Sequence, residues 1–139
     1  MDGNMTIEEL PHTADILVRV KSGSLPDLFA ESARALMGVM YENISEGQDA
    51  ISIRVVADDI SGLLADFLSE VLFISETERF VITRSEISLD GTLLEAKLIV
   101  EKFIPEKHIG GVEVKGISYS GLAIQKTEDG YQTDILFDV

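Results

Sequence analysis

The feature that most constrains the fold is a change of hydrophobic period near residue 80. Before it, apolar side chains recur at helical spacing, at positions 60, 63, 64, 67, 68, 71 and 72. This spacing predicts a helix with one buried face, capped by Asp58 or Asp59. After it, residues 80–89 and 92–101 alternate around Asp90-Gly91, a pair suited to the positive φ angles of a two-residue hairpin turn. A helix followed by a β-hairpin must pack a helical stripe against a sheet face.

The first half of the chain predicts a strand, a helix and another strand. Residues 14–20 are rich in branched side chains and end at Ser22-Gly23, as expected of a strand that enters a turn. Ser24 with Asp27 three residues later is typical of a helix N-terminus. The helix that follows has an apolar stripe made of Leu28, Phe29, Ala33, Leu36, Met37 and Met40. Residues 51–57 predict the next strand.

The last third predicts a loop over Pro105 to Gly111 and strands over residues 112–119, 121–127 and 131–138. No linker or low-complexity tract divides the chain, so we expect a single domain over residues 1–139. The predicted fold class is α+β. We expect two helices packed on one face of a mixed, mostly antiparallel sheet of about six to seven strands.

The net charge of −14 restricts the partners, because 25 Asp and Glu residues face 11 Lys and Arg. The average field repels phosphate, so we expect no direct nucleic-acid binding. A basic protein partner or a divalent cation is favoured. The alternative is that the acidic surface serves solubility alone.

The chain lacks the residues that several classes of chemistry require. The chain has no cysteine, which excludes disulfides, thiolate zinc sites and cysteine nucleophiles. It has two histidines, His12 and His108, no nucleophile elbow and no P-loop. No apolar run approaches the ~20 residues of a membrane span, and residues 1–10 lack the features of a signal peptide. We therefore expect a cytoplasmic protein without membrane contact.

Two acidic residues near the ends of the chain predict a metal site. In an extended segment Asp15 shares a face with Leu17 and Arg19, and Asp138 closes the last predicted strand beside the terminal carboxylate of Val139. Three carboxylates brought together repel one another unless a cation compensates them, which favours calcium or magnesium. In the alternative, Asp15 pairs with Arg19 or caps a local turn.

His12 precedes this aspartate in His12-Thr13-Ala14-Asp15. Histidine is a poorer ligand for hard cations, so we expect His12 to support the loop through a hydrogen bond.

Five short motifs resemble the archease family and follow one another in the order that this family has. Together they cover nearly the whole chain. They are His12-Thr13-Ala14-Asp15-Ile16, the helix entry from Gly23 to Phe29, Pro105-Glu106-Lys107-His108, the segment from Lys115 to Tyr119, and the final Asp138-Val139.

The resemblance implies a non-catalytic accessory protein of the GTP-dependent RNA ligase that joins tRNA halves during splicing. Such a protein would promote guanylylation of the ligase histidine, restore turnover and broaden the nucleotides accepted. It also implies a metal site whose ligands fall on Asp15, Asp138 and the main-chain oxygens of Val139. Of the two candidate ions we expect calcium, with magnesium as the alternative.

One motif departs from the family pattern. The family usually has Lys-Ala-Val-Thr-Tyr-His where this chain has Lys115 to Ser120, so no histidine role carries over to the residue after Tyr119. Lys115, Tyr119, His108 and His12 are the candidates for supporting the site or contacting the partner.

Two other function classes compete with the ligase activator. One is an acidic, chaperone-like or protein-binding module without ligase-specific activity. The other is a metal-dependent hydrolase, for which His12 is the only evident base near the acids.

Overall fold

The computed structural model describes residues 5–9 and 14–139, and side chains from Asp15 onward. The strands and helices are β1 (Met5–Glu9), β2 (Ala14–Ser22), α1 (Leu25–Met40), β3 (Asp49–Val56), α2 (Ile60–Glu78), β4 (Phe80–Asp90), β5 (Leu93–Lys102), α3 (Pro105–His108), β6 (Gly116–Ile117), β7 (Ile124–Thr127) and β8 (Gly130–Asp138). In this part of the chain no helix is long and apolar enough to cross a membrane.

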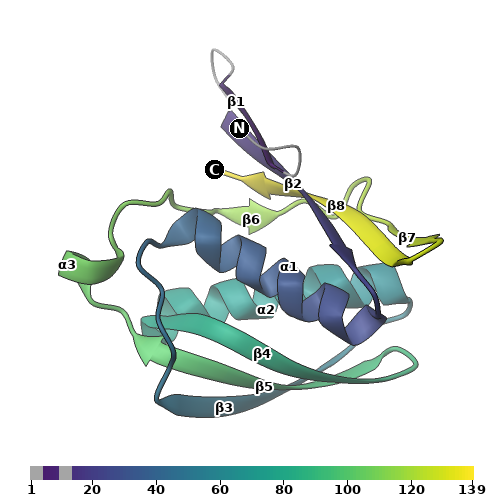
Figure 1. Cartoon of the computed structure of the whole chain (residues 1–139), viewed down its shortest axis with the longest axis horizontal. Coiled ribbons are helices and arrows are strands. Elements are labelled where there is room, and N and C mark those ends of the chain that lie inside the picture. The colour runs from purple at the N-terminus through teal and green to yellow at the C-terminus, as the bar shows by residue number, and fades with distance from the viewer. Residues whose placement is uncertain (1–4, 10–13) are drawn as a thin grey trace.

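The strands form two antiparallel sheets with α1 and α2 between them (Figure 1). One sheet has the order β1-β2-β8-β6, with β7 also paired to β8, and the other has the order β3-β5-β4. The predicted α+β class with two main helices is confirmed, but the strands do not form the single sheet that we expected. Each helix contacts both sheets, α1 through β2 and β4, and α2 through β6 and β4.

The wide apolar surface of α2 explains why this helix lies between two sheets. Its buried residues are Leu63, Leu64, Ala65, Phe67, Leu68, Val71, Leu72 and Ser75, which spread over more than one helical face. Such a helix must be covered from two sides. Each sheet covers one side with its apolar face and leaves its other face to solvent, and one hydrophobic core includes residues of both sheets.

The local signals at both helix starts and at the hairpin are confirmed. The side chain of Ser24 accepts a hydrogen bond from the main-chain N–H of Asp27 at 3.3 Å. Asp59 accepts one from the N–H of Gly62 at 2.6 Å, so it is the cap of α2. β4 and β5 pair along their length up to the turn, where Gly91 has a φ of 59°.

Two predictions for the last third of the chain were wrong. The strand expected over residues 112–119 shrinks to Gly116–Ile117, and the loop after Pro105 contains the one-turn helix α3. The chain before β6 packs on the end of α1 instead of a strand, where the N–H of Val112 donates to the carbonyl of Val39 at 3.0 Å. Strand β1 was not predicted either, and among the described residues it pairs with β2.

Candidate functional site

The two predicted acids lie opposite each other. β2 and β8 pair from Asp15 with Asp138 to Ser22 with Tyr131, which places the start of β2 beside the end of β8 (Figure 1). Directly opposed residues in an antiparallel pair have Cβ atoms about 5 Å apart. The next pair, Ile16 and Phe137, is buried, so Asp15 and Asp138 belong to the solvent face of the sheet.

The neighbouring strands extend this row of residues. Glu8 of β1 is in register with Asp15, and Gly116 of β6 is in register with Asp138. The N–H of Lys115 donates to the carbonyl of Asp138 at 2.7 Å. Lys115 therefore holds the end of β8 through its main chain.

Arg19 does not compensate the charge of Asp15, contrary to the alternative considered above. Its guanidinium donates to both carboxylate oxygens of Asp134, at 2.7 and 3.1 Å. These hydrogen bonds lower the pKa of Asp134 and the attraction of the two charges adds to the effect, although burial opposes it. Lys115 forms no ion pair within the described part of the chain. Within the described residues, neither Asp15 nor Asp138 thus forms an ion pair.

Two side-chain carboxylates alone do not make a cation site. From Asp15 onward, where side chains are described, no group of three or more His, Asp or Glu side chains is arranged to hold a metal ion. A site at Asp15 and Asp138 would need main-chain oxygens, which Val139 offers directly after β8. His12 lies outside the described residues.

The chain matches the Archease protein family (MTH1598/TM1083) over residues 7–139. The chain belongs to the archease family. Archease of Pyrobaculum neutrophilum is 34% identical over 74 residues, which are 52% of this chain and 50% of that protein. The chain therefore spans about half the length of the first relatives that it matches. Archease of Methanosarcina acetivorans is 29% identical over 95% of this chain and 94% of its own length.

A solved structure has the same fold. The crystal structure of an archease and possible chaperone from Thermotoga maritima superposes with a TM-score of 0.66 at 20% identity. It covers 95% of this chain and 96% of that one. The archease arrangement of two sheets around a helix layer is therefore shared.

Tyr119 of this archease lies against α2 and not beside the acid pair. Its hydroxyl donates to Asp66 at 2.8 Å and lies 3.2 Å from the hydroxyl of Ser69. The Ser69 hydrogen bond lowers the pKa of Tyr119, but burial, the hydrogen bond to Asp66 and the Asp66 charge outweigh it and leave the pKa raised. Tyr119 is 54% exposed as a residue, so it joins the β6 loop to α2 and keeps an accessible surface.

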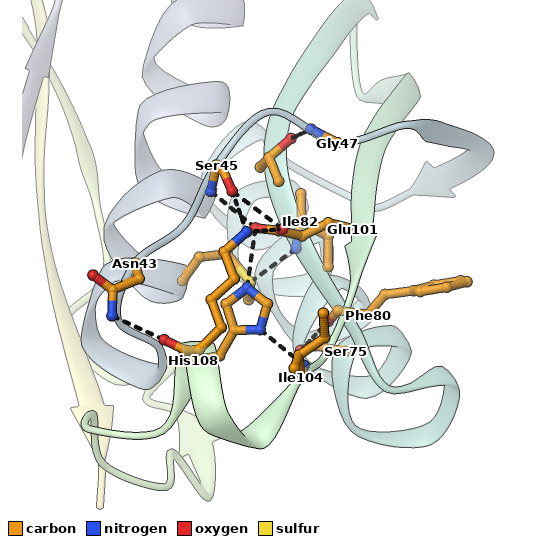
Figure 2. A network of polar contacts seen from close by, with 12 residues as sticks. Asn43, Ser45, Gly47, Ser75, Phe80, Ile82, Glu101, Ile104 and His108 are labelled. Carbon is orange, nitrogen blue, oxygen red and sulfur yellow. Dashed lines mark hydrogen bonds and ion pairs between the residues drawn. The ribbon is translucent and has the colours of Figure 1, made fainter.

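His108 lies in the interior and fixes the turn around α3 (Figure 2). Its Nδ1 accepts a hydrogen bond from the N–H of Ile104 at 2.9 Å, so a neutral ring carries its proton on Nε2. Nε2 lies 3.1 Å from a carboxylate oxygen of Glu101, at an angle too bent for a hydrogen bond. The ring also stacks on Phe103, with centroids 5.9 Å apart. His108 therefore supports the archease loop from inside.

Glu101 is the centre of this network, and the sequence analysis missed it. Its carboxylate accepts from Lys107 Nζ at 2.7 Å and from the N–H of Ser45 at 2.9 Å. Burial raises the pKa of Glu101, but these hydrogen bonds and the contact to His108 outweigh it and lower the pKa from 4.5 to about 2. Most buried residues of β5 are apolar and face the core, and this pattern predicts that Glu101 is exposed. In the structure Glu101 is covered, because α3 folds over it. The only sequence signal was a glutamate six residues before Lys107.

Proposed function

We propose that this chain is a non-catalytic accessory protein that activates the GTP-dependent tRNA-splicing RNA ligase in the cytoplasm. It would promote guanylylation of the ligase and so sustain its multiple turnover. The observation that carries the proposal is the register of β2 with β8, which sets Asp15 opposite Asp138, and neither carboxylate forms an ion pair within the described residues. Family membership supplies the connection to an accessory role.

The proposed site holds a divalent cation between Asp15, Asp138 and the main-chain oxygens of Val139. Hard oxygen ligands suit calcium, our first expectation, and magnesium as the alternative. When bound, the cation would supply positive charge for a phosphate oxygen. The chain itself keeps the two carboxylates opposed through the β2–β8 pairing, and Lys115 fixes Asp138 through its main chain.

The net charge supports a basic protein partner. An RNA ligase is expected to present a basic cleft, and a partner with a charge of −14 would be steered toward it at rates that fall with salt. The same charge argues against direct RNA binding by this chain.

A guanylylation time course tests the proposal. The ligase is incubated with labelled GTP and the ion, with this chain or with Asp15→Asn, Asp138→Asn or Asp134→Asn, at two salt concentrations. We expect the wild type and Asp134→Asn to accelerate guanylylation more than tenfold, and less at high salt, whereas Asp15→Asn and Asp138→Asn lose the effect. Asp134 is a matched control because it lies on the same face of β8 and is neutralised by Arg19. Full stimulation by both site variants would disprove the role of the acid pair.

A chaperone-like module is the second candidate, favoured by the description of the Thermotoga maritima relative as a possible chaperone. This function predicts protection of unrelated basic proteins from aggregation, with no change in ligase turnover. Light scattering of a heated basic client protein, with and without this chain, separates the two candidates.

A further inference from the structure

An apolar surface lies around α3, away from the acid pair. Ile104, Ile109 and Val112 are 45%, 68% and 45% exposed. These three residues, which we call the α3 patch, lie within nine positions of the chain. Figure 1 shows that α3 projects from the side of the helix layer, where neither sheet covers it.

A small cavity opens beside the patch. It has a volume of about 250 Å³, and Ile109 and Val112 line it with Met40, Tyr41 and Phe103. Small-molecule sites are usually larger, from roughly 300 Å³ upward. The cavity therefore suits a single apolar side chain that a partner inserts.

The patch sits on a fixed support. A Cβ added at Gly110 would collide with the side chain of Glu42, and one at Gly111 with the main chain of Met40, so the loop lies tightly against the end of α1. The N–H of Glu42 donates to the carbonyl of His108 at 2.9 Å. Beneath α3, Glu101 ties down Lys107 and Ser45 (Figure 2). A partner would pay little ordering entropy to bind a surface fixed in this way.

The rim of the cavity is acidic. Glu76 and Glu113 line it, Glu106 of α3 is exposed nearby, and none of the three forms an ion pair within the described residues. Of the nearby cations, Lys107 binds Glu101 and Arg79 lies over the ring of Phe103 at 5.2 Å, whereas Lys102 and Lys115 form no ion pair within the described residues. An apolar floor with free carboxylates at its edge is complementary to an apolar side chain flanked by Lys or Arg.

A short segment of chain joins the patch to the acid pair. Val112 is three residues before Lys115, whose N–H binds the carbonyl of Asp138, and three residues span about 11 Å at most. A protein seated on the patch would therefore also reach the Asp15–Asp138 row.

We propose that the α3 patch is the docking surface for the ligase, and that it binds a segment of the ligase in which an apolar side chain is flanked by basic residues. This inference rests on the proposed function. It assigns binding to the α3 patch and stimulation to the acid pair, so the two roles are separable by experiment.

The test measures the concentration of this chain that gives half-maximal ligase guanylylation, together with direct binding by fluorescence anisotropy of labelled chain. For Ile109→Ser with Val112→Ser we expect at least a tenfold higher half-maximal concentration and an unchanged maximum. For Glu76→Lys with Glu113→Lys we expect a three- to tenfold rise and a weaker salt dependence. Val56→Ser is the control, because Val56 is 66% exposed on β3, and it should match the wild type.

Asp15→Asn should have the opposite effect. Its binding to the ligase should be unchanged, and its maximal stimulation of guanylylation should be lost. Binding by the double serine variant at wild-type affinity would overturn the docking assignment, as would equal weakening by Val56→Ser. A dimer of the chain alone that the double variant dissociates would assign the patch to a second copy and also overturn it. If the wild type fails to stimulate the ligase, the proposed function itself fails. A photoreactive amino acid at position 109 in the otherwise unchanged chain gives an independent readout, and absence of a crosslink to the ligase there counts against the proposal.

Discussion

Two groups of carboxylates in this protein differ in how their charge is compensated. Glu101 is 11% exposed in its side chain and is surrounded by Lys107, Ser45 and His108. Asp15 and Asp138 are brought together by strand pairing on a solvent face, and Arg19 of the same strand as Asp15 is bound to Asp134. Glu101 therefore has several partners for one negative charge, whereas neither Asp15 nor Asp138 forms an ion pair within the described residues.

The difference teaches how structural and functional acids can be distinguished. A buried carboxylate with several donors stabilises the fold, because its removal leaves those donors unsatisfied. Two opposed carboxylates without a cation cost free energy, since directly opposed like charges destabilise a sheet. In the proposed function, a bound cation offsets this cost.

The largest expected effect is a loss of stability when Glu101 is replaced. We expect Glu101→Ala to lower the free energy of unfolding by about 3 kcal/mol, because Lys107 and His108 lose their shared partner in the interior. Urea denaturation followed by circular dichroism measures the change. Glu86→Ala is the matched control on the same sheet, since Glu86 binds Arg84 at the surface, and it should leave the denaturation midpoint unchanged. Equal midpoints for Glu101→Ala and wild type would contradict the structural role.

The proposed cation site at Asp15 and Asp138 predicts that calcium raises the free energy of unfolding. At a calcium concentration 100 times the dissociation constant, the free energy of unfolding should rise by about 2.7 kcal/mol. Thermal denaturation with calcium, and again after chelation, measures this rise as a reversible shift of several degrees. Asp15→Asn should abolish the shift and should not destabilise the metal-free protein, because it removes like-charge repulsion.

The control for calcium is again on β8. Asp134→Asn removes a carboxylate from the same face but leaves the Asp15–Asp138 pair intact, so its calcium response should equal that of the wild type. A response that Asp134→Asn loses and Asp15→Asn keeps would place the cation elsewhere.

Local signals predicted most of the fold. Both N-caps, both main helices and the hairpin turn at Asp90-Gly91 follow from residues within a few positions of one another. The division into two sheets does not, because it depends on which strands pair over long distances. β2 pairs with β8 and β3 with β5, and no local pattern determines either choice.

The candidate site divides in the same way. Asp15 and Asp138 were selected by their positions on strands, and the register between these strands then placed them together. Glu101 could not be selected, because its burial comes from α3 folding over the end of β5. The exposed patch at Ile104, Ile109 and Val112 was also missed, since this segment was expected to be an ordinary loop followed by a strand.

The smallest expected effect is a pH dependence that belongs to Glu101 and not to the acid pair. The pKa of Glu101 falls from 4.5 to about 2 on folding, so the folded state holds the ionised form. A lowered pKa contributes stability that is complete above the unfolded value and is lost as pH falls toward the folded value. Glu101→Gln keeps the shape of the side chain without the charge. We expect wild type to exceed Glu101→Gln in unfolding free energy by about 1.5 kcal/mol at pH 7. The difference should shrink between pH 5 and about pH 2, where the wild-type carboxyl becomes neutral too. Urea titrations of both proteins at pH 7, 4 and 2.5 measure it, and the titration of groups away from Glu101 cancels in the difference because both proteins share them. A difference that stays constant over this range would show that the charge of Glu101 does not stabilise the fold, and the contrast with Asp15 and Asp138 would then rest on packing alone.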